Sequence, residues 1–170
     1  MRILLLLIPV LAVSAFAKKA EPLKTSPVKY FKDHCARCHG TDGGMYDDFF
    51  DRGKSDKDLR DVIDRMATGP GQSPIDGIDL DAQVAYHRAI GSKLPFLTWT
   101  GQKGSVLSGD FAISGEKLTA KVGKKKLAVT DKEGTWTLTL PKGAKVEDVV
   151  LSVEKTNFKP GLKPFSGAKK

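Results

Sequence analysis

Apolar residues recur along the chain with two different periods, and the change falls near Gly91. Before this point they follow the three- and four-residue spacing of amphipathic helices. One such stripe consists of Leu59, Val62, Ile63 and Met66. Ser55 precedes this stripe and Asp58 follows three residues later, a capping-box pattern that predicts a helix beginning near Ser55. The segment 82–90 predicts a last helix, with Asp79 as its N-cap.

After Gly91 the apolar positions alternate with polar ones instead. Trp136, Leu138 and Leu140 alternate with threonines, which is typical of a half-buried strand. The other predicted strands cover residues 106–113, 118–122, 127–129 and 148–154, with turns at 123–124 and 131–134. Five or six short strands at this spacing predict a small antiparallel sandwich. The segment 134–138, Gly-Thr-Trp-Thr-Leu, is loosely similar to immunoglobulin-like modules of exported proteins.

The first residues have the features of a secretory signal. Arg2 supplies a positive charge, residues 3–13 form an almost unbroken apolar run, and Ala15-Phe16-Ala17 places small residues at a cleavage site. The run is shorter than the roughly 20 apolar residues that span a bilayer. We therefore predict cleavage after Ala17, a periplasmic chain and no stable membrane span.

The run Cys35-Ala36-Arg37-Cys38-His39 carries the candidate chemistry. A C-x-x-C-H sequence is the attachment site of c-type haem. Its two thiols add to the two vinyl groups of one haem, and the next residue supplies an imidazole to the iron. A thiol–disulfide redox pair would normally lie on a βαβ pattern, which is absent, and a zinc site would need a second Cys/His cluster. We predict one covalent haem c, held by Cys35 and Cys38, with His39 as proximal iron ligand.

Residues 25–92 resemble the small monohaem class I cytochromes c. Besides the attachment motif, the resemblance rests on Phe31, four residues before the first cysteine, and on Tyr86 in the last helix. In that family the second aromatic packs on the N-terminal helix, and Pro27 stands where a glycine is usual at this helix crossing. The expected fold class is two domains, an all-α cytochrome c fold followed by an all-β antiparallel immunoglobulin-like sandwich.

Five segments are expected. They are a signal peptide (1–17), a cytochrome c haem domain (18–92), a linker (93–103), a β-sandwich-like domain (104–160) and a flexible basic tail (161–170). Charge separates the two halves, because residues 18–92 carry a net charge of −1 and residues 93–170 a net charge of +8. The two cysteines are too few for a disulfide scaffold.

The basic half consists of lysines alone beyond Arg88, which argues against dedicated bidentate phosphate recognition. Nucleic acid is not an expected partner of an exported protein. The lysines either keep the β half soluble or steer docking to an acidic redox partner. Such a partner would dock through the haem edge or through the basic β domain, and the sequence sets no oligomeric state.

The second axial ligand of the iron departs from the family pattern. The family usually places a methionine, often followed by proline, shortly before the last helix, but Ser73-Pro74 occupies that place here. Met66, in the last turn before a glycine-rich loop, is the leading candidate for the distal ligand, since a thioether can bind haem iron. An open or water-filled site is the next candidate, followed by Met45, His87 and His34.

These features predict an electron carrier rather than an enzyme. A six-coordinate His/Met iron suits electron transfer because that ligand pair raises the reduction potential. Two other functions stay open. One is a haem-based gas- or ligand-binding protein with an open sixth iron site, and the other is a cytochrome subunit or adaptor of a larger oxidoreductase complex.

Overall fold

The structure, a computed structural model, describes residues 21–46, 53–112, 117–153, 156–161 and 165–166. The helices are α1 (Pro27–His34), α2 (Ala36–His39), α3 (Asp56–Thr68) and α4 (Gly77–Ser92). The strands are β1 (Phe96–Thr98), β2 (Gly101–Lys103), β3 (Val106–Ala112), β4 (Thr119–Val122), β5 (Lys125–Leu127), β6 (Val129–Lys132), β7 (Thr135–Thr139), β8 (Val149–Val153), β9 (Thr156–Phe158) and β10 (Phe165–Ser166), with a 3-10 turn at Val146–Asp148 before β8. The predicted signal peptide, residues 1–17, lies outside the described residues.

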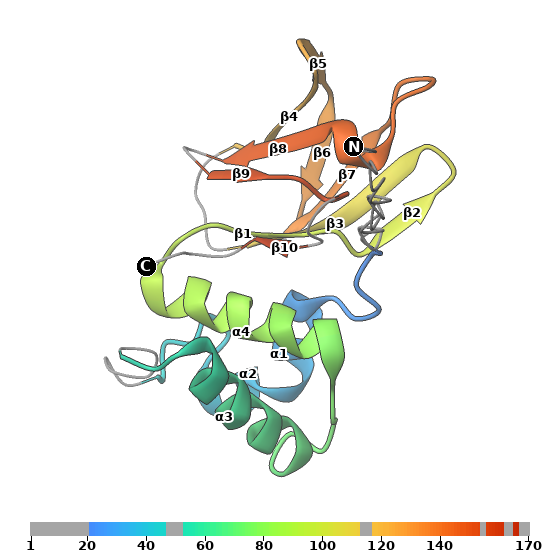
Figure 1. Cartoon of the computed structure of the whole chain (residues 1–170). Coiled ribbons are helices and arrows are strands. Elements are labelled where there is room, and N and C mark those ends of the chain that lie inside the picture. The colour runs from blue at the N-terminus through green and yellow to red at the C-terminus, as the bar shows by residue number, and fades with distance from the viewer. Residues whose placement is uncertain (1–20, 47–52, 113–116, 154–155, 162–164, 167–170) are drawn as a thin grey trace, which may run out of the picture.

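Two antiparallel sheets stand on a layer of helices, and α4 lies between the other helices and strands β1 and β10 (Figure 1). One sheet has the order β10-β1-β3-β7-β6, with β2 also paired to β3, and the other has the order β5-β4-β8-β9. Leu107 pairs with Leu138 in the first sheet, and Ala120 pairs with Leu151 in the second. These four side chains are buried in one core between the sheets.

The predicted alternation along β7 is confirmed. Trp136 and Leu138 are buried while Thr135 and Thr139 are exposed. The indole nitrogen of Trp136 donates to the carbonyl oxygens of Thr98 (3.0 Å) and Asp110 (3.2 Å), so the largest core side chain has no unsatisfied donor. The predicted strands near 118–122 and 148–154 also form, as β4 and β8.

A glycine in β3 allows this close packing. A Cβ atom at Gly109 would lie 1.8 Å from the carbonyl oxygen of Thr98 and 2.8 Å from the Trp136 ring. Any larger side chain would therefore push β1 away from the indole.

The predicted start of α3 is confirmed as well. Ser55 is the N-cap, its side chain accepts a hydrogen bond from the Asp58 backbone (3.1 Å), and the Asp58 carboxylate accepts one from the Ser55 backbone (3.2 Å). Below this cap, Leu59 and Ile63 are buried against Leu80 of α4. The capping box and the apolar stripe together fix where α3 starts and which face it buries.

The start of α4 differs from the prediction. Asp76, not Asp79, is the N-cap residue. Asp79 lies inside the first turn, where its carboxylate accepts a hydrogen bond from the backbone of Thr25 at 3.0 Å. The aspartate therefore ties the helix to the segment before α1 instead of capping its own helix.

The expected fold class, an all-α cytochrome c fold followed by an all-β immunoglobulin-like sandwich, is wrong. The described residues contain four short α-helices and two antiparallel sheets, and most of their elements are β-strands. One buried cluster joins Phe31 and Tyr86 of the helices to Phe96 of β1 and Phe165 of β10. The helices therefore do not complete this cluster by themselves, because two strands close it.

The physical reason lies in α4, which is buried on more than one side. Leu80 and Val84 pack against α3, while Ala89 and Ile90 belong to the cluster shared with β1 and β10. A helix that is apolar around most of its circumference needs cover on both sides. The segment expected as a linker, 93–103, carries β1 and β2, and the segment expected as a tail, 161–170, carries β10.

Candidate functional site

The Cys35–His39 segment forms a corner that consists of Cys35, the C-cap residue of α1, and the short helix α2. Cys35 ends α1, with its backbone nitrogen 2.8 Å from the carbonyl oxygen of Phe31. The backbone nitrogens of Cys38 and His39 each lie 3.1 Å from the carbonyl oxygen of Cys35. This single turn places the two cysteines one helical turn apart. α2 then ends at Gly40, whose φ of +78° favours glycine.

A cavity of about 180 Å³ lies beside this corner. It is lined by aromatic and aliphatic side chains together with a thiol and two imidazoles, from Tyr30, Cys35, His39, Tyr46, Val62, Ile63, Met66, Ala67 and His87. The structure thus brings three predicted site residues, Cys35, His39 and Met66, to one cavity. The fourth, Cys38, is exposed and does not line it.

Both cysteines are free thiols, and Cys35 is poorly suited to thiolate chemistry. Burial and the neighbouring Cys38 raise the pKa of Cys35 to about 11. Reactive redox cysteines have a lowered pKa, because the thiolate is the nucleophile. The microenvironment of Cys35 therefore does not favour a thiol–disulfide redox pair.

An aromatic cluster adjoins the cavity through Tyr46, which lines it. The His39 ring lies 4.6 Å from the Tyr46 ring, and Phe31 meets Tyr86 edge-on at 5.6 Å and 85°. Tyr86 therefore packs on the N-terminal helix α1, as the family resemblance implied. Burial raises the pKa of Tyr86 to about 12 and also raises that of Tyr46, so both phenols stay neutral.

The crossing of α1 and α4 supports the cluster from behind. The side-chain amide of Gln83 donates to the carbonyl oxygen of Pro27 at 2.9 Å. Pro27 occupies the first position of α1, where the missing N–H costs no helical hydrogen bond. Proline at this crossing is thus accommodated by a side-chain bond across the two helices.

His87 is the residue of the site that sequence reasoning valued too little. It is 4% exposed, and its Nδ1 lies 2.8 Å from the carbonyl oxygen of Gln83. Burial lowers the pKa of His87 to about 4, so the ring is neutral near pH 7. A carbonyl only accepts hydrogen bonds, so Nδ1 carries the proton and Nε2 is the basic nitrogen. Its spacing in the sequence, three residues after Val84 and seven after Leu80, was the available signal.

The other candidates for the distal ligand lie differently. Met66 lines the cavity but is 48% exposed, and Met45 is 73% exposed and does not line it. His34 is exposed, and its ring lies 4.7 Å from that of Tyr30, outside the cavity lining. The carbonyl oxygen of Ser73 accepts a hydrogen bond from the Tyr30 hydroxyl, so the loop where the family places its methionine is held against α1.

A larger hollow of about 560 Å³ lies on the β side, away from this chemistry. It is lined by Lys117, Lys121 and Lys126 along with short apolar and hydroxyl side chains of β4 and the β5–β6 connection. β5 stands at the opposite end of the molecule from the helices (Figure 1). Its size does not make it the better candidate, because its lining contains no imidazole, thiol or carboxylate.

Three further findings limit the interpretation. Across the described ranges, no three His, Cys, Asp or Glu side chains cluster as a metal site would require. No helix in that part of the chain is long and apolar enough to cross a membrane. No family model, curated protein or solved structure matches the chain.

Proposed function

We propose that Cys35 and Cys38 bind one haem c covalently, that His39 ligates its iron, and that the chain carries single electrons in the periplasm. The observation that carries this proposal is the C-x-x-C-H corner. Its two free thiols lie one turn apart, and its histidine lines an apolar cavity. This arrangement of thiols and imidazole is the one that haem attachment requires.

The side chains around the cavity are chemically suited to bind a haem. Its walls are mostly aromatic and aliphatic, and its nitrogen and sulfur atoms are those that haem iron accepts as ligands. Its volume of about 180 Å³ is below the roughly 300–1,000 Å³ of ordinary ligand sites. Because α3 supplies one wall through Val62, Ile63 and Met66, we expect this wall to move outward when haem is attached.

When bound, the haem supplies a one-electron iron couple, and the chain controls its surroundings. The edge-on contact between Phe31 and Tyr86 fixes α1 against α4 and so holds the corner that carries Cys35 and His39. The neutral rings of Tyr46 and Tyr86 exclude water without adding charge. An apolar, water-poor shell of this kind influences the potential of an iron centre.

Redox partners with an acidic surface suit the charge distribution. Residues 93–170 carry a net charge of +8, and the lysine-containing strand β5 lies at the end of the β layer away from the helices (Figure 1). Such a field would speed association at low ionic strength and weaken with added salt. A periplasmic location rests on the predicted signal peptide.

The decisive experiment is expression of the full chain in a bacterium that attaches c-type haem in its periplasm. We expect a coloured protein whose pigment survives acid–acetone extraction and denaturing electrophoresis, and a reversible one-electron titration. The Cys35→Ser/Cys38→Ser variant should lose the covalent pigment, while Met45→Leu, at an exposed position outside the cavity, should keep it.

A colourless wild-type protein, or pigment fully removed by acid–acetone, would refute the proposal. Rapid carbon monoxide binding by the reduced wild-type protein would keep the haem but replace electron transfer by ligand binding as the function. Binding of carbon monoxide needs an open iron position, which a six-coordinate carrier does not offer.

A further inference from the structure

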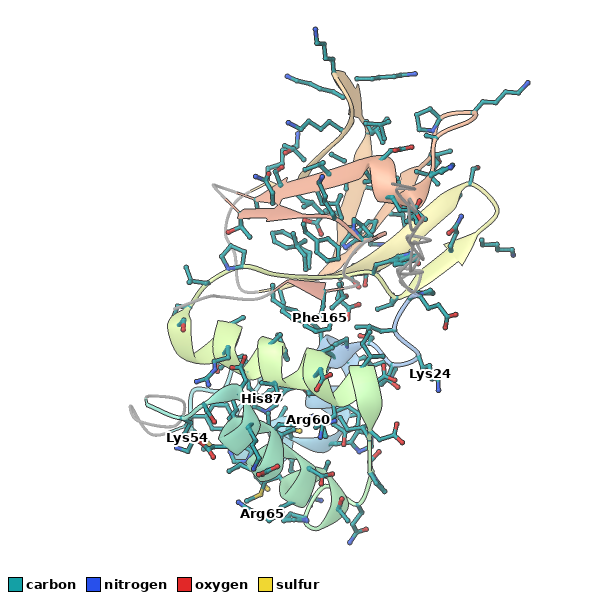
Figure 2. The ribbon with its side chains drawn as sticks, in the orientation of Figure 1. Lys24, Lys54, Arg60, Arg65, His87 and Phe165 are labelled. Atoms are coloured by element: carbon teal, nitrogen blue, oxygen red, sulfur yellow. The ribbon has the colours of Figure 1, made fainter. Side chains whose placement is uncertain are left out.

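The cavity at the C-x-x-C-H corner contains a second imidazole, from His87 in the middle of α4. Figure 2 shows His87 on the side of α4 that faces the other helices, whereas Phe165 lies on the strand side. Rings of Phe31 (5.5 Å) and Tyr46 (5.9 Å) flank the imidazole. Because α4 is packed on both sides, the position of His87 relative to the cavity is tightly constrained.

The hydrogen bond of His87 is of the kind that metal-ligating histidines make. Such histidines donate one ring N–H to a carboxylate or backbone carbonyl, which fixes the tautomer and leaves the other nitrogen for the metal. Nδ1 of His87 has this partner, the carbonyl oxygen of Gln83 at 2.8 Å. Nε2 is therefore the basic nitrogen in a side chain that lines the same cavity as His39.

Met66 offers weaker support for the same role. It lines the cavity from the last turns of α3, but its side chain is 48% exposed, against 4% for His87. An exposed, unbranched thioether is held by few contacts and has three rotatable bonds. The imidazole, in contrast, is held by its hydrogen bond to Gln83 and by contacts with the rings of Phe31, Tyr46 and Tyr86 before any ligand binds.

We propose that His87, through Nε2, is the second axial ligand of the iron, so that the centre has two imidazoles instead of an imidazole and a thioether. This inference rests on the proposed haem attachment and replaces the sequence-based candidate Met66. A methionine ligand raises the reduction potential of a haem. A bis-imidazole centre lacks this effect. We therefore expect the reduction potential of this protein to lie at the low end of the range of c-type carriers, and its electron donor to have a low potential as well.

The test uses the haem-loaded full chain and reads iron coordination by electron paramagnetic resonance and near-infrared charge-transfer bands. The oxidised wild-type protein should be low-spin with bis-imidazole bands and without the weak red band of a thioether–iron bond. His87→Leu, which keeps an apolar filling, should become high-spin. Its reduced form should bind carbon monoxide more than about tenfold faster, because no side chain must leave first.

His87→Ala supplies a rescue experiment. Free imidazole added to this variant should restore the low-spin signal, which a merely structural role of His87 would not produce. Met66→Leu should leave the bands unchanged, as should Met45→Leu and His34→Leu, whose side chains lie outside the cavity lining. Should the His87 variants fail to accumulate, the bands of the wild-type protein and of Met66→Leu decide the question alone.

A thioether band in the wild-type protein, a high-spin Met66→Leu variant, or an unchanged His87→Leu spectrum would each overturn the assignment of His87. Haem staining on a denaturing gel separates this outcome from failure of the proposed function. Stained protein with the wrong bands refutes only the ligand, whereas unstained wild-type protein refutes haem attachment itself.

Discussion

The β layer and the helical layer bury polar groups very differently. The strands bury Thr98 and Asp110, both of which are hydrogen-bonded, and the indole nitrogen of Trp136 has two acceptors. The helices bury His87 and Gln83, and within the described residues the Gln83 Oε1 atom has no hydrogen-bond partner. Buried polar atoms reduce stability unless they are hydrogen-bonded, and an unsatisfied one such as Gln83 Oε1 is often found near a functional site. We infer that the strands hold the molecule together and the helices carry its chemistry.

The largest expected effect concerns the β core. Trp136→Ala removes a fully buried indole together with both of its hydrogen bonds, and such truncations cost about 3–5 kcal/mol. The free energy of unfolding, measured by urea denaturation, should fall by this amount. Met66→Ala, at a half-exposed position of the helical layer, is the matched truncation, and a loss as large as that of Trp136→Ala would contradict the division of roles.

The second prediction concerns pH and His87 in the haem-free chain. Burial depresses the pKa of this imidazole from 6.5 to about 4, so the folded state binds fewer protons than the unfolded state between these values. The stability that its neutral form contributes is complete above pH 6.5 and is lost as the pH falls toward 4, a change of about 3 kcal/mol.

Urea denaturation across this pH range tests the effect, with His87→Leu as the control. The variant should lose much less stability between pH 6.5 and 4, because it has no imidazole to protonate at this position. If the unfolding free energy of the two proteins depended equally on pH, a group other than His87 would dominate this dependence. The buried Asp110 contributes with the opposite sign, since burial raises its pKa and its stabilisation is lost as the pH rises through that value.

The third prediction concerns the contact between the two layers. Ser26 caps α1 by accepting from the Lys29 backbone at 3.0 Å, and its hydroxyl donates to the Asp110 carboxylate of β3. Ser26→Ala should lower the unfolding free energy by about 1–2 kcal/mol, because it removes a cap and leaves a buried carboxylate with one donor fewer. Ser26→Thr, which keeps a hydroxyl, should recover most of this loss. If it recovered none, the hydroxyl group would not be the source of the stabilisation.

Local sequence patterns predicted those features of the structure that depend on residues close together in the chain. The capping box at Ser55, the alternation around Trp136 and the C-x-x-C-H corner all belong to this group. Each depends on neighbours that the sequence displays side by side, such as Asp58 for Ser55. Patterns of this kind are the most dependable part of a prediction from one sequence.

Features set by distant neighbours could not be predicted in this way. Asp79 bonds to Thr25, 54 residues away, so its sequence position suggested a cap that does not form. Strands β1 and β10 have three and two residues, too few to show a period, although they complete the helical core. His87 meets rings from Phe31 and Tyr46, and only the folded chain shows that these enclose it.

The smallest expected effect tests how freely the α3 wall can move. Arg60 of α3 donates to the Asp81 carboxylate of α4 at 2.8 Å, and both side chains are more than a third exposed. Figure 2 shows Arg60 near the junction of these helices. Exposed pairs of this kind contribute about 0.2–1 kcal/mol, so Arg60→Gln should change the unfolding free energy by no more than that.

An ion pair this weak would not keep α3 in place against an entering haem. Arg60→Gln should therefore leave the yield of covalent haem unchanged, whereas a marked rise in yield would show that this ion pair, and not apolar packing at Leu59, keeps the cavity small.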